Sequence, residues 1–221
     1  MNLLFADGGP LTSDPNYASG TNFTYSYNAR QRLSGLAKNG TGIASYEYDY
    51  AGQRVIASQL TGTPATVNYV FAPDGRLLAE HDGATGNLIR EYIWLDDMPL
   101  ALVAGSVSSP TYYYVHTGQI GEPLIVTDAS KAKVWDVAVD PWGKPTMLAT
   151  PIQTISLPGQ WYASESGLHQ NWMRDYDPTT GRYIEADPLG INAGANLYPY
   201  VSSNPLNLTD RKGNSFLSRY V

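Results

Sequence analysis

One spacing constrains this chain more than any other feature: an aromatic-x-aromatic segment returns every twenty-odd residues. The second aromatic of each copy is Tyr27, Tyr48, Phe71 and Trp94, which are 21, 23 and 23 residues apart, and a looser copy begins at Tyr112. Aromatic residues at alternate positions have the period of a half-buried strand. A near-constant period of this length is typical of a repeat architecture in which each unit packs on the next.

Each copy continues into a turn and a returning strand. In the third copy Pro73-Asp74-Gly75 follows the aromatics, and the next five residues, 76–80, are Arg-Leu-Leu-Ala-Glu. Glycine and asparagine in such turns supply the positive φ that a hairpin requires. Because one hairpin cannot bury its own apolar face, successive hairpins should pair edge to edge. The sequence therefore predicts an all-β fold of antiparallel hairpins in a curved, spiralling sheet, and the constant spacing disfavours an ordinary β-sandwich.

The composition is that of a folded, weakly charged protein. Of the 221 residues 43% are hydrophobic and 15% charged, and the formal net charge is −6. Because Lys and Arg are few and scattered, there is no basic stripe to neutralise phosphates, and we expect no nucleic-acid partner. The chain has no cysteine, which excludes disulfides, thiolate metal ligands and a cysteine nucleophile.

The sequence predicts neither a cofactor nor a metal site. His81, His116 and His169 are scattered and lack metal-ligand spacing. Residues 82–87 are acidic and contain glycine, but they lack the alternating oxygen ligands of a calcium loop. The first ten residues have no basic region and no long apolar run, and no stretch approaches transmembrane length. We therefore expect no signal peptide and no membrane insertion.

Two sets of motifs resemble bacterial YD-repeat proteins of the Rhs type. Residues 48–55 (Tyr-Asp-Tyr-Ala-Gly-Gln-Arg-Val) resemble the repeat pattern Tyr-Asp-x-x-Gly-Arg-Leu. Further segments resemble the Rhs-associated core domain nearly motif for motif, and they are residues 112–124, 140–143, 157–171, 174–184, 187–190 and 196–205. The resemblance predicts an irregular N-terminal segment (1–20), hairpin repeats (21–150), a core domain of short strands, turns and at most short helices (151–213), and a short tail (214–221).

The resemblance implies a structural role. Related proteins wrap YD-repeat sheet into a hollow shell that encloses a toxin, for secretion-system delivery, interbacterial competition or adhesion at the cell surface. Five hairpins can build only part of a shell, so we expect open sheet edges and either self-association or pairing with a longer YD-repeat shell protein. The expected location is bacterial, either cytoplasmic before export or secreted to the surface by a route that needs no signal peptide.

The resemblance also implies one chemical activity, an aspartyl autoprotease in the core that releases the segment after it. The matching residues here are Arg182, Asp187 and Asp210. Two neighbouring carboxylates cannot both ionise easily, so one can act as an acid while the other activates water, and an adjacent Arg would orient them. An Asp-Pro-x-x-Gly segment is also an ordinary turn, in which Asp187 would only bond its own backbone.

This chain departs from the family at the closing motif, where Asp210-Arg211-Lys212-Gly213-Asn214 replaces Asp-Pro-x-Gly-Leu. We therefore expect no efficient self-cleavage near Asn214 and no toxin domain in this chain. Three interpretations of the chain remain open: an orphan end without cargo, a fragment trimmed near the cleavage point, or a standalone interaction protein. The 17 Tyr and 5 Trp suggest a further alternative, a surface-adhesion or carbohydrate-binding module, which requires exposed tryptophans.

Overall fold

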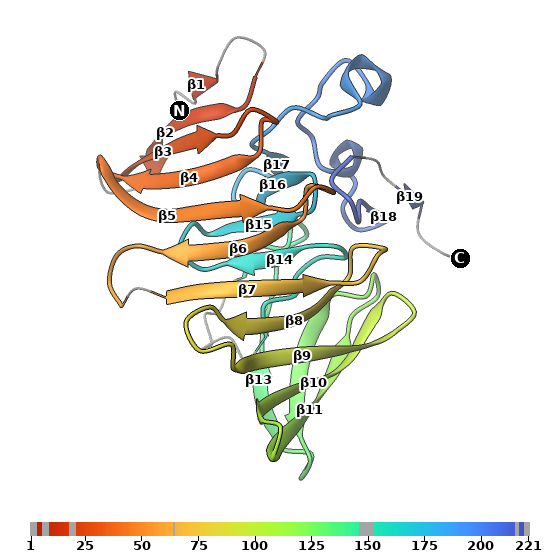
Figure 1. Ribbon diagram of the computed structural model, residues 1–221. Helices are drawn as coiled ribbons and strands as arrows, with labels where there is room; N and C mark the ends of the chain where they lie inside the picture. The colour runs from red at the N-terminus through yellow and green to blue at the C-terminus, as the bar shows by residue number, and fades with distance from the viewer. Residues whose placement is uncertain are drawn as a thin grey trace.

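The computed structural model describes residues 4–5, 9–17, 21–63, 65–145, 153–214 and 217–218. Its largest element is a thirteen-stranded sheet in which every strand pairs with its neighbours in the sequence (Figure 1). The strands are β1 (Leu4–Phe5), β2 (Leu11–Tyr17), β3 (Thr21–Tyr27), β4 (Leu33–Lys38), β5 (Thr41–Tyr48), β6 (Arg54–Gln59), β7 (Ala65–Phe71), β8 (Leu77–Asp82), β9 (Leu88–Leu95), β10 (Met98–Ser106), β11 (Ser109–Thr117), β12 (Pro123–Asp128) and β13 (Lys133–Asp136).

A C-terminal core lies against one face of this sheet. It contains a four-stranded sheet, a two-stranded ladder and two single-turn 3₁₀ helices. These elements are β14 (Trp161–Ala163), β15 (Leu168–Asn171), β16 (Arg174–Asp177), β17 (Arg182–Tyr183), η1 (Gly190–Ala193), η2 (Val201–Ser203), β18 (Leu208–Thr209) and β19 (Leu217–Ser218). Figure 1 shows the small sheet behind the middle strands of the large one, which curls as it descends towards β13.

The apolar face of the large sheet and the core bury one another. One cluster joins Leu33 and Tyr46 of the first repeats to Leu168 and Ile184 of the core. A second cluster joins strands β8 to β13 to Ile155 and Trp161. Burial of this apolar surface is the main favourable term in holding the two parts together.

The turn after β7 shows why a repeat needs glycine at one position. Gly75 has a φ of 97°, and a Cβ added there would lie 2.2 Å from the ring of Trp172. Only glycine tolerates both the positive φ and this close approach. The hairpin turn is therefore also a contact site for the core.

The predicted all-β fold, with its curved sheet of hairpins and its core of short strands, turns and short helices, is confirmed. We expected residues 1–20 to be irregular, and this is wrong for β1 and β2, which extend the sheet by two strands. Leu11 explains the difference, because it is 3% exposed and its N–H donates to the Ile184 carbonyl at 2.8 Å. The expected boundary near residue 150 lies in residues 146–152, outside the described residues, and stays a prediction. Within the described ranges, no helix is long and apolar enough to cross a membrane.

Candidate active site and the interface that holds it

Two carboxylates of the core converge on one guanidinium. Nη2 of Arg174 lies 2.6 Å from Oδ2 of Asp187 and 3.4 Å from Oδ2 of Asp210. All three residues are buried. Arg174 also donates through Nε to the Gly213 carbonyl at 2.6 Å and through Nη1 to the Leu197 carbonyl at 3.0 Å. These bonds fix the plane of the guanidinium, and charge-assisted bonds of this kind are among the strongest in proteins.

Arg174, Asp187 and Asp210 come from three different segments of the core. Arg174 begins β16, directly after a tight turn in which Trp172 has a φ of 41°. Asp187 follows β17 in an Asp-Pro turn, where its Oδ1 accepts the N–H of Leu189 at 2.9 Å. Asp210 comes directly after β18. The site therefore forms only when the core has folded.

Of the three residues singled out in the sequence, Asp187 and Asp210 both contact Arg174, but Arg182 does not join them. Arg182 is exposed and donates to Oδ1 of Asn196 at 3.3 Å. Its neighbour Tyr183 is 2% exposed, and successive side chains of a strand point to opposite faces. Because Tyr183 faces the core, the side chain of Arg182 points away from it. The same alternation in β16 places Arg174 on the face of buried Tyr176, a signal that the sequence analysis missed.

The closing segment, residues 210–213, is hydrogen-bonded to the core. The amide of Asn171 donates to the Asp210 carbonyl at 2.8 Å, and the N–H of Met173 donates to the Lys212 carbonyl at 3.1 Å. A Cβ on Gly213 would lie 2.3 Å from the Asn171 carbonyl oxygen. The segment therefore fits against the β15–β16 turn only with glycine at position 213.

Arg211 ties the same segment to the large sheet. Its guanidinium forms an ion pair with Asp97 in the β9–β10 turn. On the opposite side, a Cβ on Gly159 would lie 2.3 Å from the backbone of Arg211. The closing segment is therefore restrained at Arg211 by an ion pair to the large sheet and by close packing against Gly159.

A cavity of about 260 Å³ adjoins the charged cluster. Arg174, Asp187, Asp210 and Asn214 line one side, and residues of η1 and η2 line the other. Two carboxylates and a guanidinium beside a cavity can supply an acid, a base and a positive charge for amide hydrolysis. In the part of the chain that is described, no group of three or more His, Asp or Glu could hold a metal ion.

A second buried charge pair joins the core to the repeats. Nη2 of Arg54, in β6, lies 2.8 Å from both carboxylate oxygens of Asp175, in β16. Arg54 is 1% exposed, and its guanidinium carbon lies 3.8 Å from the centre of the Tyr46 ring. Burial opposes the charge on Arg54, but Asp175 and the neighbouring tyrosines outweigh it and hold the pKa of Arg54 well above its usual value.

Glu185 adds a second buried carboxyl to this interface. Its Oε2 accepts the backbone N–H of Asp175 at 2.8 Å, while its Oε1 has no hydrogen-bond partner. Burial, together with the charge of Asp175, raises the pKa of Glu185 well above its usual value. Burial also raises the pKa of Asp175, but the charge and hydrogen bonds of Arg54 oppose that rise, so Glu185 is the carboxyl of the two that holds a proton more readily.

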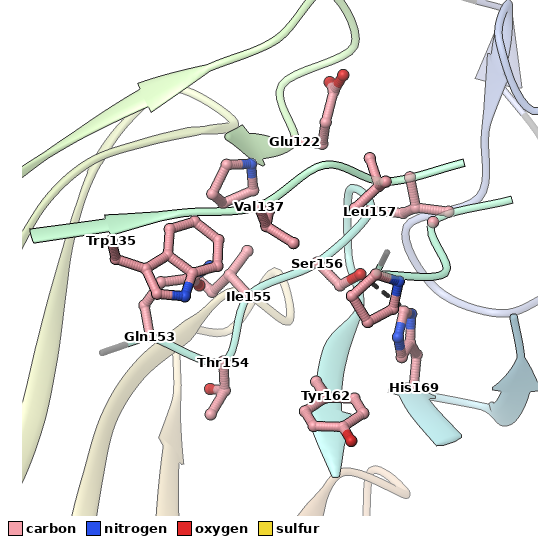
Figure 2. A pocket seen from close by; sticks show the side chains of 14 residues that line it. Glu122, Trp135, Val137, Gln153, Thr154, Ile155, Ser156, Leu157, Tyr162 and His169 are labelled. Atoms are coloured by element: carbon pink, nitrogen blue, oxygen red, sulfur yellow. Dashed lines mark hydrogen bonds between the residues drawn. The ribbon is translucent and has the colours of Figure 1, made fainter. Parts of the chain in front are cut away.

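Another cavity, of about 90 Å³, lies between β13 and residues 153–157 (Figure 2). Figure 2 shows Ser156 bonded to His169, whose Nδ1 lies 3.0 Å from Oγ of Ser156 and 3.0 Å from Oε1 of Gln160. Burial lowers the pKa of His169 to about 3. A ring that resists protonation this strongly is a poor general base at neutral pH, so the Ser156–His169 pair holds the fold and does not activate a nucleophile.

The five tryptophans do not form an exposed binding surface. Trp135 and Trp161 are buried, and Trp94, Trp142 and Trp172 are half-buried. The indole N–H of Trp94 bonds to the Leu77 carbonyl, and that of Trp172 to the Ala51 carbonyl. The exposed tryptophans that an adhesive or carbohydrate-binding module requires are therefore missing.

Sequence comparison relates the chain to bacterial toxins. Double-stranded DNA deaminase toxin A of Burkholderia cenocepacia is 29% identical over 195 residues, which cover 76% of this chain and 14% of that protein. Toxin protein Tse5 of Pseudomonas aeruginosa is 28% identical over 229 residues, which cover 89% of this chain and 17% of that protein. The uncharacterised protein YibJ of Escherichia coli is 41% identical over 101 residues, 44% of this chain and 43% of YibJ. No family model matches the sequence.

Structure comparison relates the fold to Tc toxin assemblies. The crystal structure of TcdB2-TccC3-Cdc42 matches with a TM-score of 0.74 at 21% identity, over 96% of this chain and 11% of the other. The Tc holotoxin pore of Photorhabdus luminescens matches with a TM-score of 0.72 at 20% identity, over 95% and 10%. The chain has the open, antiparallel sheet fold of these assemblies, and it spans less than half the length of each relative described. We expected a resemblance to Rhs-type YD-repeat proteins. The comparisons confirm the broader part of this expectation, a similarity to large bacterial toxin proteins.

Replacing Glu185 tests the buried carboxyl. Below the usual Glu pKa of 4.5 Glu185 is protonated in both the folded and the unfolded state, so it does not lower the free energy of unfolding. As pH rises above that value only the unfolded state ionises freely, so stability falls by about 1.4 kcal/mol per pH unit until the folded carboxyl also ionises. We expect Glu185→Gln to be more stable than the wild type at pH 8 and no more stable at pH 4, by urea unfolding. Glu47→Gln, the same change at an exposed position, is the matched control, and parallel curves for wild type and Glu185→Gln would refute the assignment.

Proposed function

We propose that this chain supplies part of the wall and the closing core of an Rhs-type YD-repeat shell, used to enclose and deliver a toxin polypeptide in competition between bacteria. The observation that carries the proposal is a curved, open sheet that holds its own C-terminal segment in a core fixed to one face. Its similarity to bacterial toxins and to the TcdB2–TccC3 fold supports the same role. The proposed location follows from it: bacterial, with export by a route that needs no signal peptide.

The second face of the sheet supports a role in contact with other polypeptide. Ile93 and Tyr114 both face Ala101 across their strands, and they are 41% and 48% exposed. Further exposed apolar side chains on strands β9 to β12 are Leu95, Leu100, Tyr112 and Ile125, and two more, Val70 and Val134, lie on β7 and β13. Contiguous apolar surface on a soluble protein marks an interaction site, and tyrosine tolerates varied partners.

The sheet edges provide the second support. Strands β1 and β13 end the order of the described sheet, and neither pairs with a further strand there. An open edge presents unpaired N–H and C=O groups to any strand that can add to it. We propose a second copy of the chain, or a longer YD-repeat shell protein, as the partner.

Light scattering over a wide range of concentration tests this partnership. We expect the protein to associate, and Val134→Pro in edge strand β13 to weaken association because proline removes a backbone donor and disfavours strand addition. Val107→Pro, at an exposed hairpin turn, is the matched control. A monodisperse wild-type monomer, together with no YD-repeat protein captured from the source cells, would contradict the proposal.

Slow self-cleavage after Asn214 is the second candidate function. The convergence of Asp187 and Asp210 on Arg174, beside the cavity that Asn214 lines, favours it. In this reaction a water oxygen adds to the Asn214 carbonyl carbon while one carboxylate takes the water proton. The C–N bond then breaks as the other carboxyl protonates the leaving nitrogen, which yields a carboxylate on Asn214 and an amine on the following residue. The changed closing motif leads us to expect a slow reaction.

Intact-mass spectrometry during prolonged incubation tests this candidate. We expect a slowly accumulating product that ends at Asn214, and its loss in Asp187→Asn and Arg174→Lys. Arg182→Lys is the matched control, because this arginine lies outside the cluster and its change should leave the rate unaltered. A wild-type chain that keeps its full mass would end the idea.

A further inference from the structure

A buried tyrosine connects to the charged cluster through its hydroxyl. The Tyr183 hydroxyl donates to Oδ2 of Asp210 at 2.9 Å, and its oxygen accepts from Nδ2 of Asn171 at 2.7 Å. We propose that Tyr183, oriented by Asn171, is a positioning residue that keeps Asp210 ionised and so favours Asp210 as the base. This inference rests on the self-cleavage candidate and adds the residues that distinguish its two carboxyls.

The direction of the hydrogen bonds follows from the chemistry of the partners. Nδ2 of Asn171 also donates to the Asp210 backbone carbonyl at 2.8 Å, and a carbonyl oxygen can only accept. That bond fixes which end of the Asn171 amide faces Tyr183, so the amide must donate to the tyrosine oxygen as well. The single hydroxyl proton of Tyr183 is then free to point at the Asp210 carboxylate.

The hydroxyl is held in place and remains protonated. Tyr183 is 2% exposed, the centre of its ring lies 3.7 Å from the guanidinium carbon of Arg174, and the ring packs edge-on against Tyr176 and Tyr200. Burial, reinforced by Asp210, raises the pKa of Tyr183 well above its usual value. The phenol therefore acts as a donor across the whole pH range in which the protein would be assayed.

The surroundings of the two carboxyls differ. Asp210 faces Arg174, Asp187 and the tyrosines 183 and 200, and its Oδ2 accepts the phenol proton. Asp187 lies closer to Arg174, and its Oδ1 accepts a backbone N–H from Leu189. Two carboxylates beside one guanidinium leave an uncompensated negative charge when both are ionised, so a proton bound to the pair is shared unequally. A hydrogen bond from a neutral phenol favours the ionised form of the carboxyl that receives it, and here that carboxyl is Asp210.

The test compares two Tyr→Phe variants in the full chain. Tyr183→Phe removes only the hydroxyl, whereas Tyr176→Phe, the matched control, removes a hydroxyl of the same aromatic cluster that bonds to the Trp142 carbonyl. We expect Tyr183→Phe to shift the acid limb of the cleavage pH profile upward by about one pH unit, a roughly tenfold loss of rate at pH values on that limb. Tyr176→Phe should leave the position of the limb unchanged. A uniform loss of rate in Tyr183→Phe, with no shift of the limb, would overturn the proposal, because that is the signature of a purely structural role.

A direct titration separates failure of this inference from failure of the self-cleavage candidate. If the wild type does not cleave at any pH, the candidate reaction fails, and the Asp210 side-chain carboxyl is followed by carbon-detected NMR in the same proteins. We expect its midpoint to be about one pH unit higher in Tyr183→Phe than in the wild type. Equal midpoints would overturn the role of Tyr183. Asn171→Ala serves if Tyr183→Phe does not fold, and it should shift the same midpoint in the same direction, because the phenol is then no longer oriented.

Discussion

The buried Arg54–Asp175 pair fixes how the C-terminal core packs against the large sheet. Removing two opposite charges from water costs free energy that good geometry and further hydrogen bonds must offset. Here Nη2 of Arg54 bonds both carboxylate oxygens of Asp175 and donates to the Tyr48 hydroxyl at 2.9 Å, whereas Nη1 is buried without a hydrogen-bond partner. The pair joins the repeat sheet to the core across 121 positions of the sequence. Apolar burial favours any docking of the two parts, while this directional contact selects one arrangement.

The alternation of side chains in β16 links that contact to the charged cluster. Asp175 faces the repeat sheet, and its neighbour Arg174 points the other way, to Asp187 and Asp210. Successive residues of a strand always diverge in this manner. Fixing Asp175 against Arg54 therefore also fixes the direction of Arg174. The closing segment is held in turn by Arg174, by the β15–β16 turn and by the Arg211–Asp97 ion pair.

Sequence patterns predicted the local structure well, because aromatic alternation and turn residues act over a few positions. They failed for β2, which contains Pro15 and lacks the aromatic-x-aromatic signature, yet pairs with β3. For the site, the sequence singled out Asp187 and Asp210 with Arg182, whereas the arginine that contacts both aspartates is Arg174. The strand face of Tyr183 distinguishes the two arginines. The partners of Arg54 and Glu185 could not be predicted, because such pairings arise only when distant segments fold together.

A double-mutant cycle between Arg54 and Asp175 measures how strongly this pair joins the large sheet to the core. Arg54→Met and Asp175→Leu, alone and together, would be compared by the free energy of unfolding in urea. We expect each single change to destabilise the protein by about 3–5 kcal/mol, because it leaves the other charge buried and unpaired. The double variant should recover much of that loss, with a coupling energy of about 2–3 kcal/mol. Single effects that simply add would contradict the account, since they would mean that the repeats and the core are joined without this pair.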